Sequence, residues 1–245
     1  MKLKRLFIAA ILILAVFFIY LSTVDKKVYY LNLGDSLATG VTPYKTEDYG
    51  YSDYLKDYLT EKNLLEKYVS GFSESEYRTT DLIRDIEDNK KLENGITLKN
   101  ALIKADLVTL SIGFNDLYAK IGPSVLMPEI DQNKMYQYTD EVIIDLEKLL
   151  KLLREYCKED ILMINYYNPI ETDEPKVEEF FRYANKRLKD LCETYEIQYI
   201  DIYTLFEDHH NIYLPNPNDI HPSKEGYQAI SDAIIDVIEK TLLKR

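Results

Sequence analysis

Cysteine is scarce in this sequence. Its two copies, Cys157 and Cys192, form no CxxC pair and have no metal-ligand spacing with the three histidines. The sequence therefore predicts no metal site and no cofactor. Both cysteines fall in segments with a helical pattern, so we expect two buried thiols, with a single disulfide as the alternative. Tryptophan is absent and glycine has only eight copies, but neither shortage excludes a class of function.

Basic residues are also in short supply. Lysine and arginine together number 30 against 42 aspartates and glutamates, which gives a formal net charge of -12. The shortage is uneven, because residues 1–27 are basic and the remainder is correspondingly more acidic. An acidic surface repels the phosphates of nucleic acids, so no nucleic-acid partner is expected.

One long hydrophobic run is present, at residues 6–21, and three basic residues precede it. With the next three residues it reaches the length of a membrane-spanning helix, and its basic flank keeps the N-terminus in the cytoplasm. Few small residues follow the run, which makes a poor signal-peptide cleavage site. The sequence predicts a single-pass membrane anchor in 1–27 and an extracytoplasmic domain in 28–245. A cleaved signal, the alternative, would give a secreted protein.

Short apolar runs alternate with amphipathic stretches over residues 28–245. Five runs predict strands at Val28–Leu33, Tyr68–Glu74, Asp106–Ile112, Ile161–Tyr167 and Gln198–Tyr203. Six stretches predict helices at Tyr51–Lys62, Thr79–Asn89, Leu98–Lys104, Tyr136–Lys158, Glu174–Tyr195 and Ser223–Leu243. This alternation indicates a parallel sheet with helices on both faces. Ile121–Lys134, which contains two prolines, is expected to be a loop.

Three strand ends carry residues suited to chemistry, and ligands of such sheets lie beyond the carboxyl ends of the strands. Ser36 follows the first strand in a Gly-Asp-Ser triplet, where it is either a nucleophile or a helix cap. Asn115 follows the third strand and can donate an amide N–H to a tetrahedral intermediate, or cap a turn. His221 lies in a proline-rich loop before the last helix, within reach of Ser36. His209 and His210 are expected to be solvent-exposed loop residues.

The order of these blocks, Gly-Asp-Ser, Gly-x-Asn-Asp and Asp-x-His-Pro-Ser, resembles that of the SGNH hydrolases, the GDSL esterase and lipase family. The resemblance covers about residues 28–243. It implies a three-layer, flavodoxin-like α/β sandwich with a mainly five-stranded parallel sheet. It also implies that Ser36 is the nucleophile, that His221 is the general base, and that Asn115 and the Ser36 N–H bind the oxyanion.

Segments such as LGDSLATG and LPNPNDIHPS are similar to those of small extracellular or membrane-anchored esterases of Gram-positive bacteria. The implied activity is hydrolysis of carboxyl esters by an extracytoplasmic serine esterase without a cofactor. The implied substrates are short acyl esters, O-acetylated wall glycans or lysophospholipids. We rank short acyl esters above long-chain lipids, because no apolar lid helix is evident.

Two positions depart from the family pattern. The second block normally supplies a glycine whose N–H completes the oxyanion hole. Gly71 is one match, but the sequence that follows the block aligns better with Glu76 in the glycine position. The family also places an aspartate three residues before the histidine. Asn218 occupies that position here and Asp219 lies one residue later, so we expect Asp219, Asn218 or a backbone carbonyl to orient His221.

These departures leave two further hypotheses. A carboxylate beside a developing oxyanion is unfavourable unless it points to solvent, so the chain could be a surface binding protein that retains the fold and has lost activity. A phosphate-ester hydrolase that uses Asp35 or Asp116 is the third hypothesis, although the sequence shows no cluster of metal ligands.

Overall fold

The computed structural model describes residues 27–121, 131–170 and 175–244. Within these residues the centre is one parallel sheet of five strands, namely β1 (Val28–Gly34), β2 (Leu65–Val69), β3 (Leu107–Ser111), β4 (Asp160–Ile164) and β5 (Gln198–Ile200). Their spatial order is β2-β1-β3-β4-β5. The order reverses between β1 and β3, and such a switch point leaves a crevice at the carboxyl ends of the two strands.

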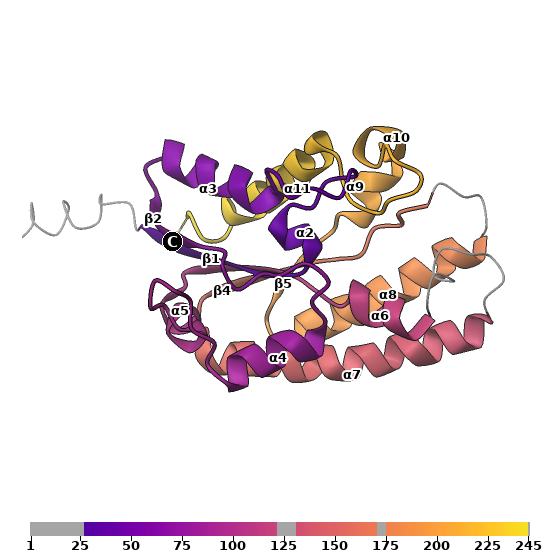
Figure 1. Ribbon diagram of the computed structural model, residues 1–245, viewed down its shortest axis with the longest axis horizontal. Helices are drawn as coiled ribbons and strands as arrows, with labels where there is room; N and C mark the ends of the chain where they lie inside the picture. The colour runs from indigo at the N-terminus through magenta and orange to yellow at the C-terminus, as the bar shows by residue number, and fades with distance from the viewer. Residues whose placement is uncertain (1–26, 122–130, 171–174, 245) are drawn as a thin grey trace, which may run out of the picture.

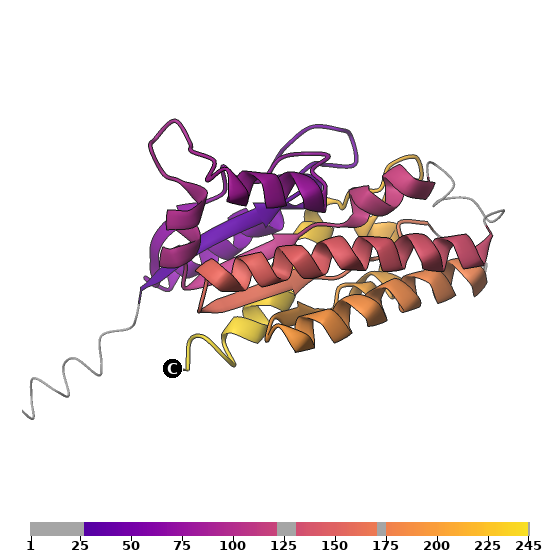
Figure 2. The same cartoon turned by 90° about the horizontal axis from the view of Figure 1, so that it is seen from below.

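Helices cover both faces of the sheet, as Figures 1 and 2 show. One face carries α2 (Ser36–Thr39), α3 (Tyr51–Glu61), α9 (Tyr203–Glu207), α10 (His210–Tyr213) and α11 (Lys224–Ile238). The other carries α4 (Thr79–Glu87), α5 (Leu98–Lys104), α6 (Phe114–Ile121), α7 (Gln132–Tyr156) and α8 (Pro175–Thr194). The predicted three-layer α/β architecture with a five-stranded parallel sheet is confirmed.

The alternation of side chains along β1 builds two cores. Tyr29, Leu31 and Leu33 belong to the cluster shared with α4, α5, α7 and α8. Val28 and Tyr30 belong to the cluster shared with α3 and α11. Every residue of β1 is buried, since both faces of a central parallel strand are covered by helices. This packing fixes the strand whose carboxyl end carries Ser36.

Several element boundaries differ from the predictions. The second strand is Leu65–Val69 and not Tyr68–Glu74, because it is an edge strand whose charged and half-exposed residues gave no apolar signal. Helix α7 begins at Gln132, inside the predicted loop, whose residues 122–130 lie outside the described part of the chain. Helices α2, α6, α9 and α10 were not predicted. Three of them have only four or five residues, which contain too little periodicity to recognise, and α6 follows β3 so closely that it was interpreted as part of the strand-end motif.

The predicted membrane anchor lies outside the described residues. Among the helices of the described part, none is both long and apolar enough to cross a bilayer. The two cysteines are described: Cys157 and Cys192 are fully buried and unbonded, as the favoured alternative predicted.

Candidate active site

A close approach between two strand ends positions Ser36. Gly34, the last residue of β1, has φ +140°, and a Cβ there would lie 2.0 Å from the carbonyl oxygen of Ser111 at the end of β3. A side chain cannot fit, so this glycine is required. The Asp35 N–H donates to the same Ser111 carbonyl at 2.9 Å. The chain then turns into α2, whose first residue is Ser36.

Asp35 caps α2 directly before Ser36. Its Oδ1 accepts hydrogen bonds from the Leu37 N–H at 3.1 Å and from Ser111 Oγ at 3.0 Å. The side chain is buried, and burial raises the pKa of Asp35 to about 7 against the opposing effect of these two hydrogen bonds. A carboxyl group that caps a helix in this way supports the fold around Ser36 and leaves the Ser36 hydroxyl free to contact His221.

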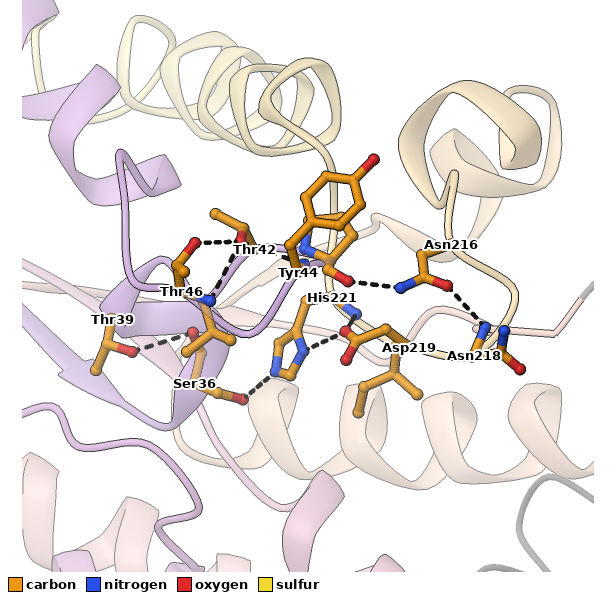
Figure 3. Close-up of polar contacts among 12 residues, drawn as sticks. Ser36, Thr39, Thr42, Tyr44, Thr46, Asn216, Asn218, Asp219 and His221 are labelled. Atoms are coloured by element: carbon orange, nitrogen blue, oxygen red, sulfur yellow. Dashed lines mark hydrogen bonds and ion pairs between the residues drawn. The ribbon is translucent and has the colours of Figure 1, made fainter.

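His221 links Ser36 to a carboxylate, as Figure 3 shows. His221 Nε2 lies 2.9 Å from Ser36 Oγ, and Nδ1 lies 2.6 Å from Asp219 Oδ1. The same Asp219 oxygen accepts the His221 backbone N–H at 2.9 Å. Asp219 therefore orients the imidazole from two positions before it. The Asn218 N–H instead donates to Asn216 Oδ1 at 3.1 Å.

Two contacts hold the histidine loop, and the sequence did not indicate either. Asn216 Nδ2 donates to the Pro43 carbonyl at 2.7 Å, which ties this loop to the segment that follows α2 (Figure 3). Tyr167 donates its hydroxyl to the Ile220 carbonyl at 2.6 Å. Each of these side chains donates to a backbone carbonyl that is distant in sequence. Every residue has a backbone carbonyl, so the amino-acid sequence does not show which one is the partner. The loop is thus fixed on either side of Asp219.

Asn115, the second residue of α6, borders the same two pockets as Ser36 and His221. Its Nδ2 donates to the Tyr77 carbonyl at 2.9 Å, and the second N–H of that amide has no acceptor among the described residues. Asp116 strengthens the same junction, since it accepts from both the N–H and the hydroxyl of Thr79 at 2.9 and 3.0 Å. Together they fix the segment that contains Glu76 against the start of α6.

Glu76, and not Gly71, lies at the site. Glu76 borders one pocket together with Ser36, Asn115 and His221, whereas Gly71 packs against Leu92 and borders neither pocket at Ser36. The Glu76 backbone is left-handed, with φ +66°, a conformation that disfavours a residue with a β-carbon by about 1–2 kcal/mol. Within the described part of the chain, no atom accepts a hydrogen bond from the backbone N–H of Glu76 or of Ser36.

Two hollows of different size meet at Ser36, Asn115 and His221. The smaller has a volume of about 40 Å³, and its wall mixes apolar residues such as Leu37, Phe114 and Pro169 with polar residues such as Ser111 and Asn165. The larger has a volume of about 710 Å³, and its wall contains more charged residues, namely Lys45, Glu47, Glu76, Arg78 and Asp219. An ester carbonyl at Ser36 would have a small space on one side and a wide space with a charged wall on the other.

Other predicted candidates lie elsewhere or have structural partners. His209 stacks on Tyr213 at 5.2 Å between ring centroids, and neither His209 nor His210 borders the pockets at Ser36. Burial raises the pKa of Asp116, and Thr79 opposes that rise through its two hydrogen bonds. Over the described ranges, no group of three or more His, Cys, Asp or Glu side chains gathers in a geometry that could hold a metal ion.

The fold and this geometry define an α/β protein of the doubly wound class, with a Ser–His–Asp hydrogen-bonded chain at the carboxyl edge of its parallel sheet. Residues 33–229 match the family model of the GDSL-like lipase and acylhydrolase family. The chain belongs to this family, as its sequence motifs predicted. Among curated protein sequences, none matches it.

Solved structures share the fold at low sequence identity. The lipase Lip_vut3 from a goat rumen metagenome superposes with a TM-score of 0.68 at 22% identity, over 84% of this chain and 95% of the lipase. Axe2, an acetylxylan esterase from Geobacillus stearothermophilus, gives a TM-score of 0.64 at 19% identity, over 88% of this chain and 95% of the esterase. The described sheet and helices thus form most of a complete domain of this type.

Proposed function

We propose that this chain is a serine esterase that hydrolyses short acyl esters of polar alcohols. The observation that carries the proposal is the hydrogen-bonded chain from Ser36 Oγ through His221 to Asp219. A serine hydroxyl becomes a strong nucleophile when a positioned base takes its proton, and a carboxylate on the far ring nitrogen fixes the required tautomer. Membership of a family of lipases and acylhydrolases supports the same reaction.

The proposed reaction has two halves. His221 Nε2 takes the proton of Ser36 while Oγ attacks the acyl carbon, and the carbonyl oxygen becomes an oxyanion. Asn115 Nδ2 and the N–H groups of Ser36 and Glu76 donate hydrogen bonds to that oxyanion. His221 then gives the proton to the departing alcohol, which leaves an acyl-enzyme. A water molecule, deprotonated by His221, attacks the acyl-enzyme and releases the acid and Ser36.

In the proposed complex each of the two hollows binds a different part of the ester. The smaller one takes the acyl group, and about 40 Å³ suits an acetyl or similarly short chain better than a fatty acyl chain. The larger hollow takes the alcohol, and its charged wall suits a hydrophilic group such as a wall glycan. The likeness in fold to an acetylxylan esterase agrees with this division. Lysophospholipids with long acyl chains fit it less well.

An active-site probe tests the proposal most directly. A fluorophosphonate should label the wild-type protein and not Ser36→Ala, and only the wild type should hydrolyse p-nitrophenyl acetate. Hydrolysis should fall sharply from acetyl to decanoyl esters, because the small hollow has no room for the longer chain. Equal labelling or hydrolysis by Ser36→Ala would exclude Ser36 as the nucleophile. Absence of both in the wild type would favour the binding-protein hypothesis that Glu76 motivates.

We further propose that residues 1–27 hold the enzyme at the cell membrane with its catalytic domain on the extracytoplasmic side. The basic flank and the apolar run at 6–21 support this orientation. A protease added to intact cells should remove the domain from the full-length chain. N-terminal sequencing should find residues 1–24 retained, whereas a mature protein that lacks them would show that the segment is a cleaved signal.

A further inference from the structure

The Glu76 side chain occupies an unusual position for a carboxylate. It borders the large hollow with Ser36, Asn115 and His221, while its own backbone is left-handed at φ +66°. The backbone is fixed there, because Asn115 holds the Tyr77 carbonyl on the C-terminal side of Glu76. A residue kept in an unfavourable backbone conformation at a site is a reason to look for a function of its side chain.

The charge of Glu76 is not neutralised by an ion pair. The Glu76 side chain makes no salt bridge or hydrogen bond with another described residue, and the same holds for the side chains of Lys45, Glu47 and Arg78 around the hollow. The Arg78 backbone N–H donates to Asp81 Oδ2 at 3.0 Å. Glu74, only two residues away, differs: it pairs with Lys90 at 3.5 Å and does not border the hollow. The side-chain charges around the hollow are therefore exposed to a bound ligand.

The wall of the hollow is negative overall when His221 is neutral. It contains three carboxylates, those of Glu47, Glu76 and Asp219, against the two cations Lys45 and Arg78. The positive charge of Arg78 also favours the ionised form of the buried Asp116 carboxyl group, so it is shared between Asp116 and the hollow. Without Glu76 the two signs would balance, so Glu76 decides the sign of the field that an incoming alcohol meets.

We infer that Glu76 is a specificity-determining residue, which selects esters whose alcohol carries a positive charge over neutral esters and over anionic ones. The inference rests on the proposed function of the site. The carboxylate attracts a cation on the alcohol side, whereas it repels an anionic alcohol in both the bound ester and the transition state.

Three acetates of similar size test this inference: acetylcholine, its uncharged analogue 3,3-dimethylbutyl acetate, and 2-acetoxyethanesulfonate. For the wild type we expect kcat/KM to decrease in that order. In Glu76→Gln the ratio of kcat/KM for the cationic to the neutral ester should fall by roughly three- to tenfold, as one exposed charge at short range allows. High salt should reduce the wild-type ratio toward that of the variant.

Two matched variants sharpen the test. Arg78→Gln removes a charge of opposite sign from the same wall, so the ratio should rise. Glu74→Gln removes a nearby carboxylate outside the hollow, so the ratio should stay at its wild-type value. An unchanged ratio in Glu76→Gln, together with serine-dependent hydrolysis of the neutral ester, would overturn this inference alone. If no acetate is hydrolysed in a Ser36-dependent manner, the proposed function fails with it.

Discussion

Two groups of residues around Ser36 depart from the family pattern: those on its acid–base side and those on its oxyanion side. The two departures have different structural results. On the acid–base side, Asp219 lies two residues before His221 instead of three, yet its carboxylate reaches Nδ1 at 2.6 Å. On the oxyanion side, Glu76 stands in a glycine position and leaves a left-handed backbone and an unpaired carboxylate. A loop can absorb a one-residue shift by changing its turn. A left-handed backbone position accepts a β-carbon only at a cost in stability, because the restriction is local to the residue itself.

The largest effect is expected on the acid–base side. Asp219→Asn should keep the loop but lose the charge that holds the imidazole tautomer and stabilises imidazolium, so kcat should fall by roughly 10³- to 10⁴-fold. Asn218→Ala should leave kcat close to wild type, because Asn218 makes no contact with His221 through its side chain. Steady-state kinetics on p-nitrophenyl acetate measure both. A strong loss in Asn218→Ala with a small one in Asp219→Asn would reverse the assignment.

A somewhat smaller loss is expected at the oxyanion side. Asn115→Ala removes one donor to the oxyanion, and such a removal lowers kcat by about 10²- to 10³-fold. The lost bond to the Tyr77 carbonyl should also destabilise the fold by about 1 kcal/mol. KM should change little, since the donor acts mainly in the transition state. A rise in KM with unchanged kcat would show that Asn115 serves substrate binding alone.

Asp35, which directly precedes Ser36, predicts that the free energy of unfolding depends on pH. The pKa of buried Asp35 is about 7 in the folded state and 3.8 as a reference, so the folded state binds its proton more tightly. Stability should therefore be highest below about pH 4 with respect to this group, and decrease as pH rises to about 7, by roughly 2–4 kcal/mol. Chemical denaturation of the wild type and Asp35→Asn at pH 5 and at pH 8 measures the difference.

The variant should lack this pH-dependent decrease, because an amide does not titrate in this range. The two proteins should consequently differ most in their trend between the two pH values, whatever their absolute stabilities. If the stabilities of the two proteins change with pH in parallel, Asp35 is ionised in the folded protein well below neutral pH. The hydrogen bonds from Ser111 and Leu37 would then stabilise its ionised form.

The smallest expected effect concerns the backbone at Glu76. Glu76→Gly should stabilise the protein by about 1 kcal/mol, which corresponds to a rise in Tm of about 2–4 °C for a chain of this size. Glu76→Ala should not, since alanine retains the β-carbon. Thermal unfolding of both variants separates backbone strain from charge. Equal stabilisation in both variants would show that the Glu76 carboxylate, and not the left-handed φ angle, destabilises the protein.

Much of the framework could be predicted from local pattern. Four of the five strands and six of the ten helices in the described part were predicted at or near their positions, because buried strands are continuously apolar and amphipathic helices show a clear period. Strand β2 was misplaced because an edge strand, half exposed, lacks both signals. The site motifs were visible for the same local reason: Ser36, Asn115 and His221 each follow a recognisable strand or precede a recognisable helix.

The sequence by itself determined the family and the layered α/β class, and it singled out Ser36, Asn115 and His221 as candidates, since these depend on periodicity and on motifs within a few neighbouring residues. Only the tertiary structure decided between Asp219 and Asn218, and between Glu76 and Gly71. Those choices depend on how loops are held by segments distant in sequence, as in the bond from His221 to Ser36, 185 residues apart, and the bond from Asn216 to Pro43, 173 residues apart. The packing of these loops in the folded protein sets such distances. It brings the Asp219 carboxylate to His221 Nδ1 and the backbone of Glu76 to the pocket.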